Sequence, residues 1–155
     1  ALGRVDAERA RETLVAVTAD HGHIETDGHV DLTGNDVVRR SLAETADGTR
    51  IPPLGSPRQL QFHLRDGRVE AVRRVLERTV DCLTFTRSEY ATEDLFGPGD
   101  PTPAFERSAP DLLCVPRSES VWFGGDAPAE VGMHGGLSPA EMLVPFAVAN
   151  LRTLQ

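Results

Sequence analysis

The sequence predicts an α/β fold that carries a small α+β insert, and three observations support this prediction. Residues 13–18 (TLVAVT) are a continuous apolar run of β-forming residues, which is typical of a strand buried on both faces. Residues 58–124 alternate between strand and helix patterns. Residues 132–149 then close the chain with a glycine turn, a short helix and a second apolar strand. We expect the segments at 13–18 and 143–149 to lie in one sheet.

The N-terminal part is expected to contain a helix end, a strand and a turn-rich segment. Residues 6–12 suit the end of a helix, and the strand at 13–18 stops at the tripeptide Asp20-His21-Gly22. Polar side chains at the carboxyl end of such a strand lie where open α/β sheets bind their ligands. Residues 25–57 are rich in turn signals, with one short helix expected at 36–42.

The insert has the clearest periodicity. Strict alternation at 59–64 predicts a half-buried strand. Apolar residues at helical spacing predict an amphipathic helix over 68–80: Val69, Val72, Val75, Leu76 and Val80. Further strands are expected at 82–86, 112–116 and 120–123, with a turn or short helix after 86 and a proline-containing loop at 98–110. The predicted organisation is therefore a partial α/β core at 1–57 and 125–155, interrupted by an inserted α+β subdomain at 58–124.

Composition excludes several classes of partner. The net charge is −8, with 24 acidic residues, and all 16 basic residues are arginine, so no nucleic-acid surface is expected. No apolar run approaches the roughly 18 residues of a membrane span, and residues 1–15 show no signal-peptide pattern. We therefore expect a cytoplasmic protein without a membrane segment. Cys82 and Cys114 have no CxxC spacing and are expected to be buried free thiols.

Two distant segments each place a histidine in a glycine-containing turn beside an apolar element. They are Asp20-His21-Gly22 and His134-Gly135-Gly136. Carboxylate and imidazole groups are usual ligands of zinc and similar divalent ions. Glycine beside a ligand permits close approach of the backbone or a substrate. The candidate metal ligands are therefore Asp20, His21 and His134.

The longer strings around these residues resemble a known family. Residues 15–22 (VAVTADHG) resemble the strand-plus-ligand motif of the alkaline phosphatase superfamily, and residues 132–146 (GMHGGLSPAEMLVPF) are similar to the motif with which many members end. Among its branches, the chain looks most like type I phosphodiesterase/nucleotide pyrophosphatase-like proteins. The resemblance implies the C-terminal part of an alkaline-phosphatase-like α/β sandwich, acting on a small phosphate ester or nucleotide substrate.

The resemblance also implies roles for the candidate ligands. The family uses two divalent metal ions, for which zinc, manganese and iron all suit the donors; we expect zinc or manganese. Asp20 and His21 would bind the metal that also holds the nucleophile, and His134 would bind the other.

The family's nucleophilic Thr or Ser and its remaining ligands precede the Asp-His strand. Only nineteen residues precede Asp20 here, and Thr13 and Thr18 belong to the predicted strand. We therefore expect no catalytic residue in this chain, no activity from it in isolation, and self-association through apolar faces left uncovered.

Two further residues are candidates for substrate binding. His23 is expected to support the site or its substrate rather than to bind a metal, and Arg58 to approach a phosphate, although an exposed arginine is the ordinary alternative. Two other functions remain open: a phosphotransferase similar to the phosphoglycerate mutases, or a non-catalytic domain with a vestigial metal motif.

Overall fold

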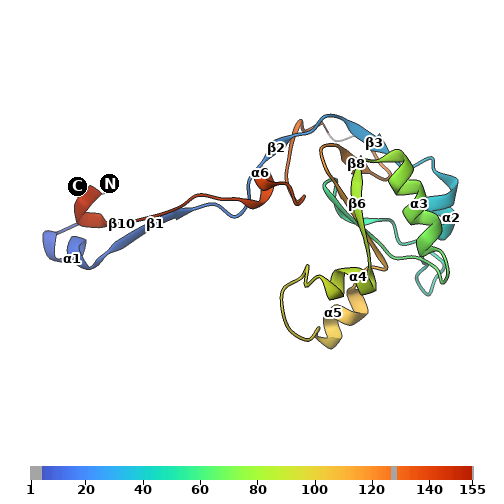
Figure 1. Cartoon of the computed structure of the whole chain (residues 1–155), viewed down its shortest axis with the longest axis horizontal. Coiled ribbons are helices and arrows are strands. Elements are labelled where there is room, and N and C mark those ends of the chain that lie inside the picture. The colour runs from blue at the N-terminus through green and yellow to red at the C-terminus, as the bar shows by residue number, and fades with distance from the viewer. Residues whose placement is uncertain (1–4, 127–128, 155) are drawn as a thin grey trace.

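The computed structural model describes residues 5–126 and 129–154, and it is a mixed α/β protein with two unlike parts (Figure 1). A compact part, here called the body, comprises residues 24–126 and 129–133. A long two-stranded ribbon extends from it and ends in a short helix, α1 (Ala7–Glu12), beside a 3-10 turn, η2 (Leu151–Leu154). The first and last described elements thus lie together at the far tip of this ribbon.

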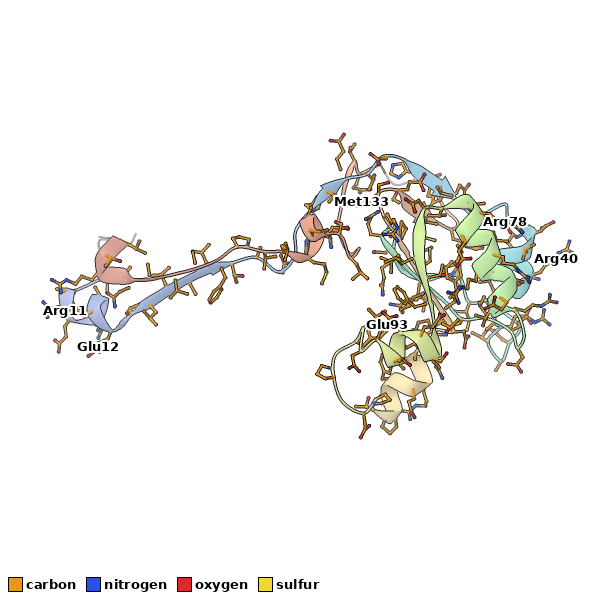
Figure 2. All side chains as sticks on the ribbon, in the orientation of Figure 1. Arg11, Glu12, Arg40, Arg78, Glu93 and Met133 are labelled. Carbon is orange, nitrogen blue, oxygen red and sulfur yellow. The ribbon has the colours of Figure 1, made fainter. Side chains whose placement is uncertain are left out.

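The ribbon consists of β1 (Leu14–Thr18) and β10 (Phe146–Asn150), which pair antiparallel from Leu14 opposite Asn150 to Thr18 opposite Phe146. The prediction that these two apolar segments share a sheet is confirmed. Burial on both faces is not observed, because β10 is the only strand paired with β1 in the described part of the chain. Leu14 is 69% exposed and Phe146 is 75% exposed. Figure 2 shows the side chains of the ribbon standing away from it on both sides.

The body is built on a four-stranded antiparallel sheet in the order β4 (Leu54–Ser56), β5 (Gln59–Phe62), β7 (Leu112–Pro116) and β6 (Cys82–Thr86). Alternation predicted a half-buried strand at β5, and its residues do alternate between partly and fully buried. All five residues of β7 are buried, because it lies between β5 and β6 in the middle of the sheet.

Two helices complete the main core. Helix α3 (Val69–Thr79) closely matches the predicted range and contacts β6, β7 and the shorter α2 (Asp36–Ser41). Their apolar side chains join those of the sheet in one buried cluster: Leu32, Val38, Leu42, Leu60, Phe62, Leu64, Val72, Leu76, Val80, Leu112, Cys114 and Val121. The core thus includes residues on both sides of position 58, where the sequence places the start of the insert.

A second, smaller cluster packs below the sheet, around α4 (Arg87–Thr92) and α5 (Pro103–Ser108). Tyr90 is its centre and donates its hydroxyl proton to the carbonyl oxygen of Pro110 at 2.8 Å. The expectation of a plain loop over 98–110 is wrong, because it contains α5. Thr102 caps this helix by accepting from the backbone N–H of Phe105, and a proline occupies its first turn.

The body also contains two pairs of short strands. β3 (His29–Asp31) pairs parallel with β8 (Ser120–Trp122), and β2 (Ile24–Glu25) pairs antiparallel with β9 (Gly132–Met133). Helix α6 (Pro139–Met142) lies where the ribbon meets the body (Figure 1). Among the described residues, none of the helices is long and apolar enough to cross a bilayer.

Candidate metal centre

The two histidine motifs meet between the ribbon and the body. His21 follows β1 and His134 follows β9, and their imidazole rings stack with centroids 3.7 Å apart and planes inclined by 8°. β1 leads directly into the first motif and β9 into the second. Two segments far apart in the sequence therefore contribute adjacent side chains to one place.

Asp20 lies next to this pair with its carboxylate exposed. It accepts the backbone N–H of His21 at 3.0 Å, and its second oxygen lies 3.6 Å from His21 Nε2. Backbone hydrogen bonds, first from its own N–H and then from that of His21, lower the pKa of Asp20, and electrostatic interactions with the His21 and His134 side chains lower it further. The carboxyl group is thus ionised at neutral pH, as a metal ligand must be.

A backbone carbonyl sets the tautomer of His21. Its Nδ1 lies 2.8 Å from the carbonyl oxygen of Gly22, which can only accept a hydrogen bond. Nδ1 therefore carries the proton in the neutral ring, and Nε2 presents its lone pair. Fixing one ring nitrogen in this way is how metal-binding histidines are commonly oriented.

His23 forms the outer part of the same group. Its ring centroid lies 5.6 Å from that of His134 and 6.3 Å from that of His21, with tilted planes. The ring packs over Gly132, where an added Cβ would lie 2.9 Å from the His23 ring atoms. His23 is therefore held against β9, beside the stacked pair.

Gly22 permits the closest backbone approach in this region. Its N–H donates to the carbonyl oxygen of Glu141 at 2.7 Å, and a Cβ at this position would lie 1.8 Å from the carbonyl oxygen of Ala140. Any larger residue would push the His21 turn away from α6. Gly22 thus connects the His21 turn to α6, the helix that follows the His134 turn.

Arg58 is buried in the structure, in contrast to the expectation from the sequence. The ordinary expectation of an exposed arginine is wrong, because the residue is 0% exposed. Its Nε and Nη2 donate to the two carboxylate oxygens of Glu141 at 3.0 and 2.9 Å. Nη2 also donates to the carbonyl oxygen of Arg117 at 2.9 Å, and Nη1 donates to that of Glu119. Each guanidinium nitrogen is engaged inside the protein, so we assign Arg58 no phosphate contact.

Glu141 is the partner that the sequence did not reveal. Ser138 is the N-cap residue of α6 and Pro139 its first residue, but the Ser138 side chain makes no capping hydrogen bond. Instead the Ser138 hydroxyl donates to Glu141 Oε2 at 2.7 Å, and the N–H of Gly136 donates to Oε1 at 2.9 Å. Burial by itself raises the pKa of Glu141, but the hydrogen bonds from Arg58, Ser138 and Gly136 outweigh it and lower the pKa to about 2.

The donors present fit a divalent metal in their chemistry. One carboxylate and two imidazoles suit zinc or manganese. Within the described residues, however, no three such groups are arranged to hold an ion, and the two stacked rings do not converge on one point. The chain therefore carries ligands of the predicted kind without forming a complete site from them.

Comparisons of the chain with protein-family models, with curated proteins and with solved structures gave no match. The superfamily remains a resemblance of the two motifs, and its activity is a proposal.

Proposed function

We propose that this chain supplies part of the two-metal centre of a phosphoric ester hydrolase, of the phosphodiesterase/nucleotide pyrophosphatase type within the alkaline phosphatase superfamily. The observation that supports this most is the stacking of His21 on His134 beside Asp20. Two motifs that resemble the superfamily's ligand motifs, and that lie near opposite ends of the chain, bring their candidate ligands together.

Each of these residues has a state suited to its proposed role. Asp20 is ionised at neutral pH, and its lowered pKa extends the ionised form to lower pH. His21 offers Nε2 because Nδ1 donates to a carbonyl. His134 stands in a turn where Gly135 has φ +108°, a conformation that glycine adopts without strain. When bound, two divalent ions, zinc or manganese, would supply the positive charge that holds the attacking and leaving oxygens of an in-line displacement.

The proposal assigns the nucleophile and the remaining ligands to polypeptide outside these 155 residues. The hydroxyl groups nearest to the two motifs in the sequence support this assignment. Ser138 donates to the buried Glu141 carboxylate, and the Thr18 hydroxyl lies on the exposed ribbon, 3.5 Å from the carbonyl oxygen of Ala19. The uncovered apolar ribbon is also what one expects of strands that belong to a larger sheet.

A substrate panel on the full-length protein tests the proposal. Turnover of a nitrophenyl phosphodiester in preference to the monoester and to phosphoglycerate, lost with a chelator and restored by zinc or manganese, is the expected result. Isomerisation of phosphoglycerate would favour the phosphotransferase alternative, and no turnover of any substrate would favour a vestigial motif.

Two substitutions connect that activity to this site. Asp20→Asn and His134→Ala should each lower kcat/KM by more than about 100-fold, since changes to the partners of ligands alone cost about 10- to 100-fold. His63→Ala, on the body, is the matched control and should leave it unchanged. Diesterase activity in the 155-residue chain alone would contradict the assignment of the nucleophile to another segment.

A further inference from the structure

We propose that Arg58 and Glu141 are a positioning pair that holds His21 against His134. The role of this pair in positioning metal ligands rests on the proposed function, whereas its geometry is independent of that proposal. The two side chains are 0% and 1% exposed and form a two-bond ion pair, although their positions are 83 apart in the sequence. A long-range buried pair of this kind fixes the relative position of the two segments that carry it.

Glu141 connects this pair to the His134 turn. Its Oε1 accepts the N–H of Gly136, two residues after His134, and its Oε2 accepts the hydroxyl of Ser138. Gly136 has no room for a side chain, since a Cβ there would lie 2.7 Å from Glu141 Oε2 and 2.8 Å from Arg58 Nη2. The His134 turn therefore packs directly against the ion pair.

The backbone of Glu141 connects the same pair to the His21 turn. Its carbonyl oxygen accepts the N–H of Gly22 at 2.7 Å, and the carbonyl oxygen of that same Gly22 lies 2.8 Å from Nδ1 of His21. One residue, Glu141, thus bonds through its side chain to the turn that carries one histidine and through its backbone to the turn that carries the other.

Arg58 anchors this arrangement to the body. It lies between β4 and β5, at the edge of the four-stranded sheet, and donates to the carbonyl oxygens of Arg117 and Glu119 just before β8. These carbonyls belong to the segment that leads from the buried β7 to β8. The position of the histidine pair is therefore set by the body, through Arg58 and then Glu141.

The chemistry of buried ion pairs explains why such a pair serves position rather than stability. Removing charges from water costs nearly as much as their attraction returns, so a well-packed apolar pair of similar size is often as stable. An apolar pair cannot accept from Gly136 and Ser138, however, and so cannot hold the turn. Stability and positioning can thus be separated by substitution.

The double variant Arg58→Met/Glu141→Leu makes that separation in the 155-residue chain. The readout is the nuclear Overhauser effect between ring protons of His21 and His134, which needs no metal and no activity. We expect this signal in the wild-type chain and its loss in the double variant, with the melting temperature changed little. The matched control Arg73→Met/Glu77→Leu removes another hydrogen-bonded ion pair, on α3, and should keep the signal.

A milder variant covers the case in which the double variant unfolds. Ser138→Ala removes one hydroxyl bond to Glu141 and leaves both charges in place. We expect it to weaken the His21–His134 signal in a folded chain. An undiminished signal in a folded double variant, or in Ser138→Ala if the double variant unfolds, would overturn the inference. Absence of the signal from the wild type would overturn it as well.

The full-length protein distinguishes this inference from the proposed function. If the protein is a diesterase, the double variant should lose about 10- to 100-fold in kcat/KM, as expected for residues that orient ligands, and Ser138→Ala should lose less. If it shows no hydrolase activity, the proposed function fails while the signal between the histidine rings still tests the pair. A folded double variant with full activity would overturn the positioning role alone.

Discussion

Strands β1 and β7 have the same kind of sequence and opposite surroundings. Each is a run of five residues without a charge, LVAVT in β1 and LLCVP in β7. All five residues of β7 are buried, whereas four of the five in β1 are exposed. The difference arises from neighbours: β7 has a strand on either side and helices packed nearby, and β1 pairs with β10 alone among the described residues.

The comparison shows that the ribbon has the sequence of a core without the contacts of one. A two-stranded ribbon is marginal in water by itself, and exposed apolar strands with free edges are sites of pairing with other chains. The body does not need further contacts to bury its apolar residues, because its cluster of twelve buried residues is already covered. The stability of the molecule should thus reside in the body, and its tendency to associate in the ribbon.

A matched pair of phenylalanines tests this contrast with the largest expected effect. Phe62 in β5 is fully buried, and Phe146 in β10 is 75% exposed. Phe62→Ala should lower the free energy of unfolding by about 3–5 kcal/mol, and Phe146→Ala should change it by less than about 0.5 kcal/mol. Chemical denaturation of both variants at low protein concentration measures this. Equal losses would mean that the ribbon is packed against something in solution.

The second prediction concerns pH and the junction between the two regions. The ordinary pKa of 4.5 for Glu141 is lowered to about 2, against the effect of its burial, by Arg58 and its other donors. A lowered pKa means that its stabilising contribution is complete above about pH 4.5 and is lost as the pH falls towards 2. The loss should reach about 3 kcal/mol.

The measurement is denaturation between pH 6 and pH 2 of the wild type and of Arg58→Met/Glu141→Leu. Other carboxyl groups with lowered pKa values, such as Glu77 and Glu89, are present in both proteins and cancel in the difference. The wild type should lose about 3 kcal/mol more than the variant. If the free energy of unfolding of the two proteins falls equally with pH, the partners of Glu141 do not stabilise its ionised form.

A pair of glycines gives the third and smaller effect. A methyl group at Gly22 would meet the backbone of α6, while at Gly28 nothing lies within 4 Å. Gly22→Ala should destabilise the chain by about 1–3 kcal/mol, as forced overpacking does, and Gly28→Ala should be nearly neutral. Amide exchange of α6 in both variants is the direct measurement. Equal protection would contradict the close approach.

These predictions rest on features that the sequence revealed to different degrees. The range of α3 was predictable because apolar periodicity is a local signal. The pairing of β1 with β10 was predictable because two apolar runs stand beside the two motifs that resemble one family's fold. Helix α5 was missed because prolines favoured a loop, although Thr102 and Pro103 mark a helix start. The Asp20, His21 and His134 motifs were recognisable as strings, and the structure brings them together; their binding of metal stays a prediction.

The Arg58–Glu141 pair was beyond sequence reasoning for a physical reason. An arginine in a turn is ordinarily solvated, and a glutamate at the third position of a helix ordinarily caps it. Both expectations fail because the two side chains meet across 83 positions, and no local pattern encodes such a distance. What sequence shows as two unremarkable polar residues becomes, in the fold, the connection between body and site.

The smallest expected change in stability accompanies a large change in assembly. Phe146 and Val148 lie on one face of the ribbon, because they are two residues apart in β10 and side chains along a strand alternate between faces. Phe146→Glu should alter the free energy of unfolding by less than about 0.5 kcal/mol, yet it should shift the chain towards monomer in light scattering, because a charge on an apolar association surface must be desolvated. Val37→Glu, at an exposed position on α2, is the matched control and should not shift assembly. A wild-type chain that is monomeric at every concentration would show that the exposed ribbon does not drive association, and the contrast between β1 and β7 would then concern burial alone.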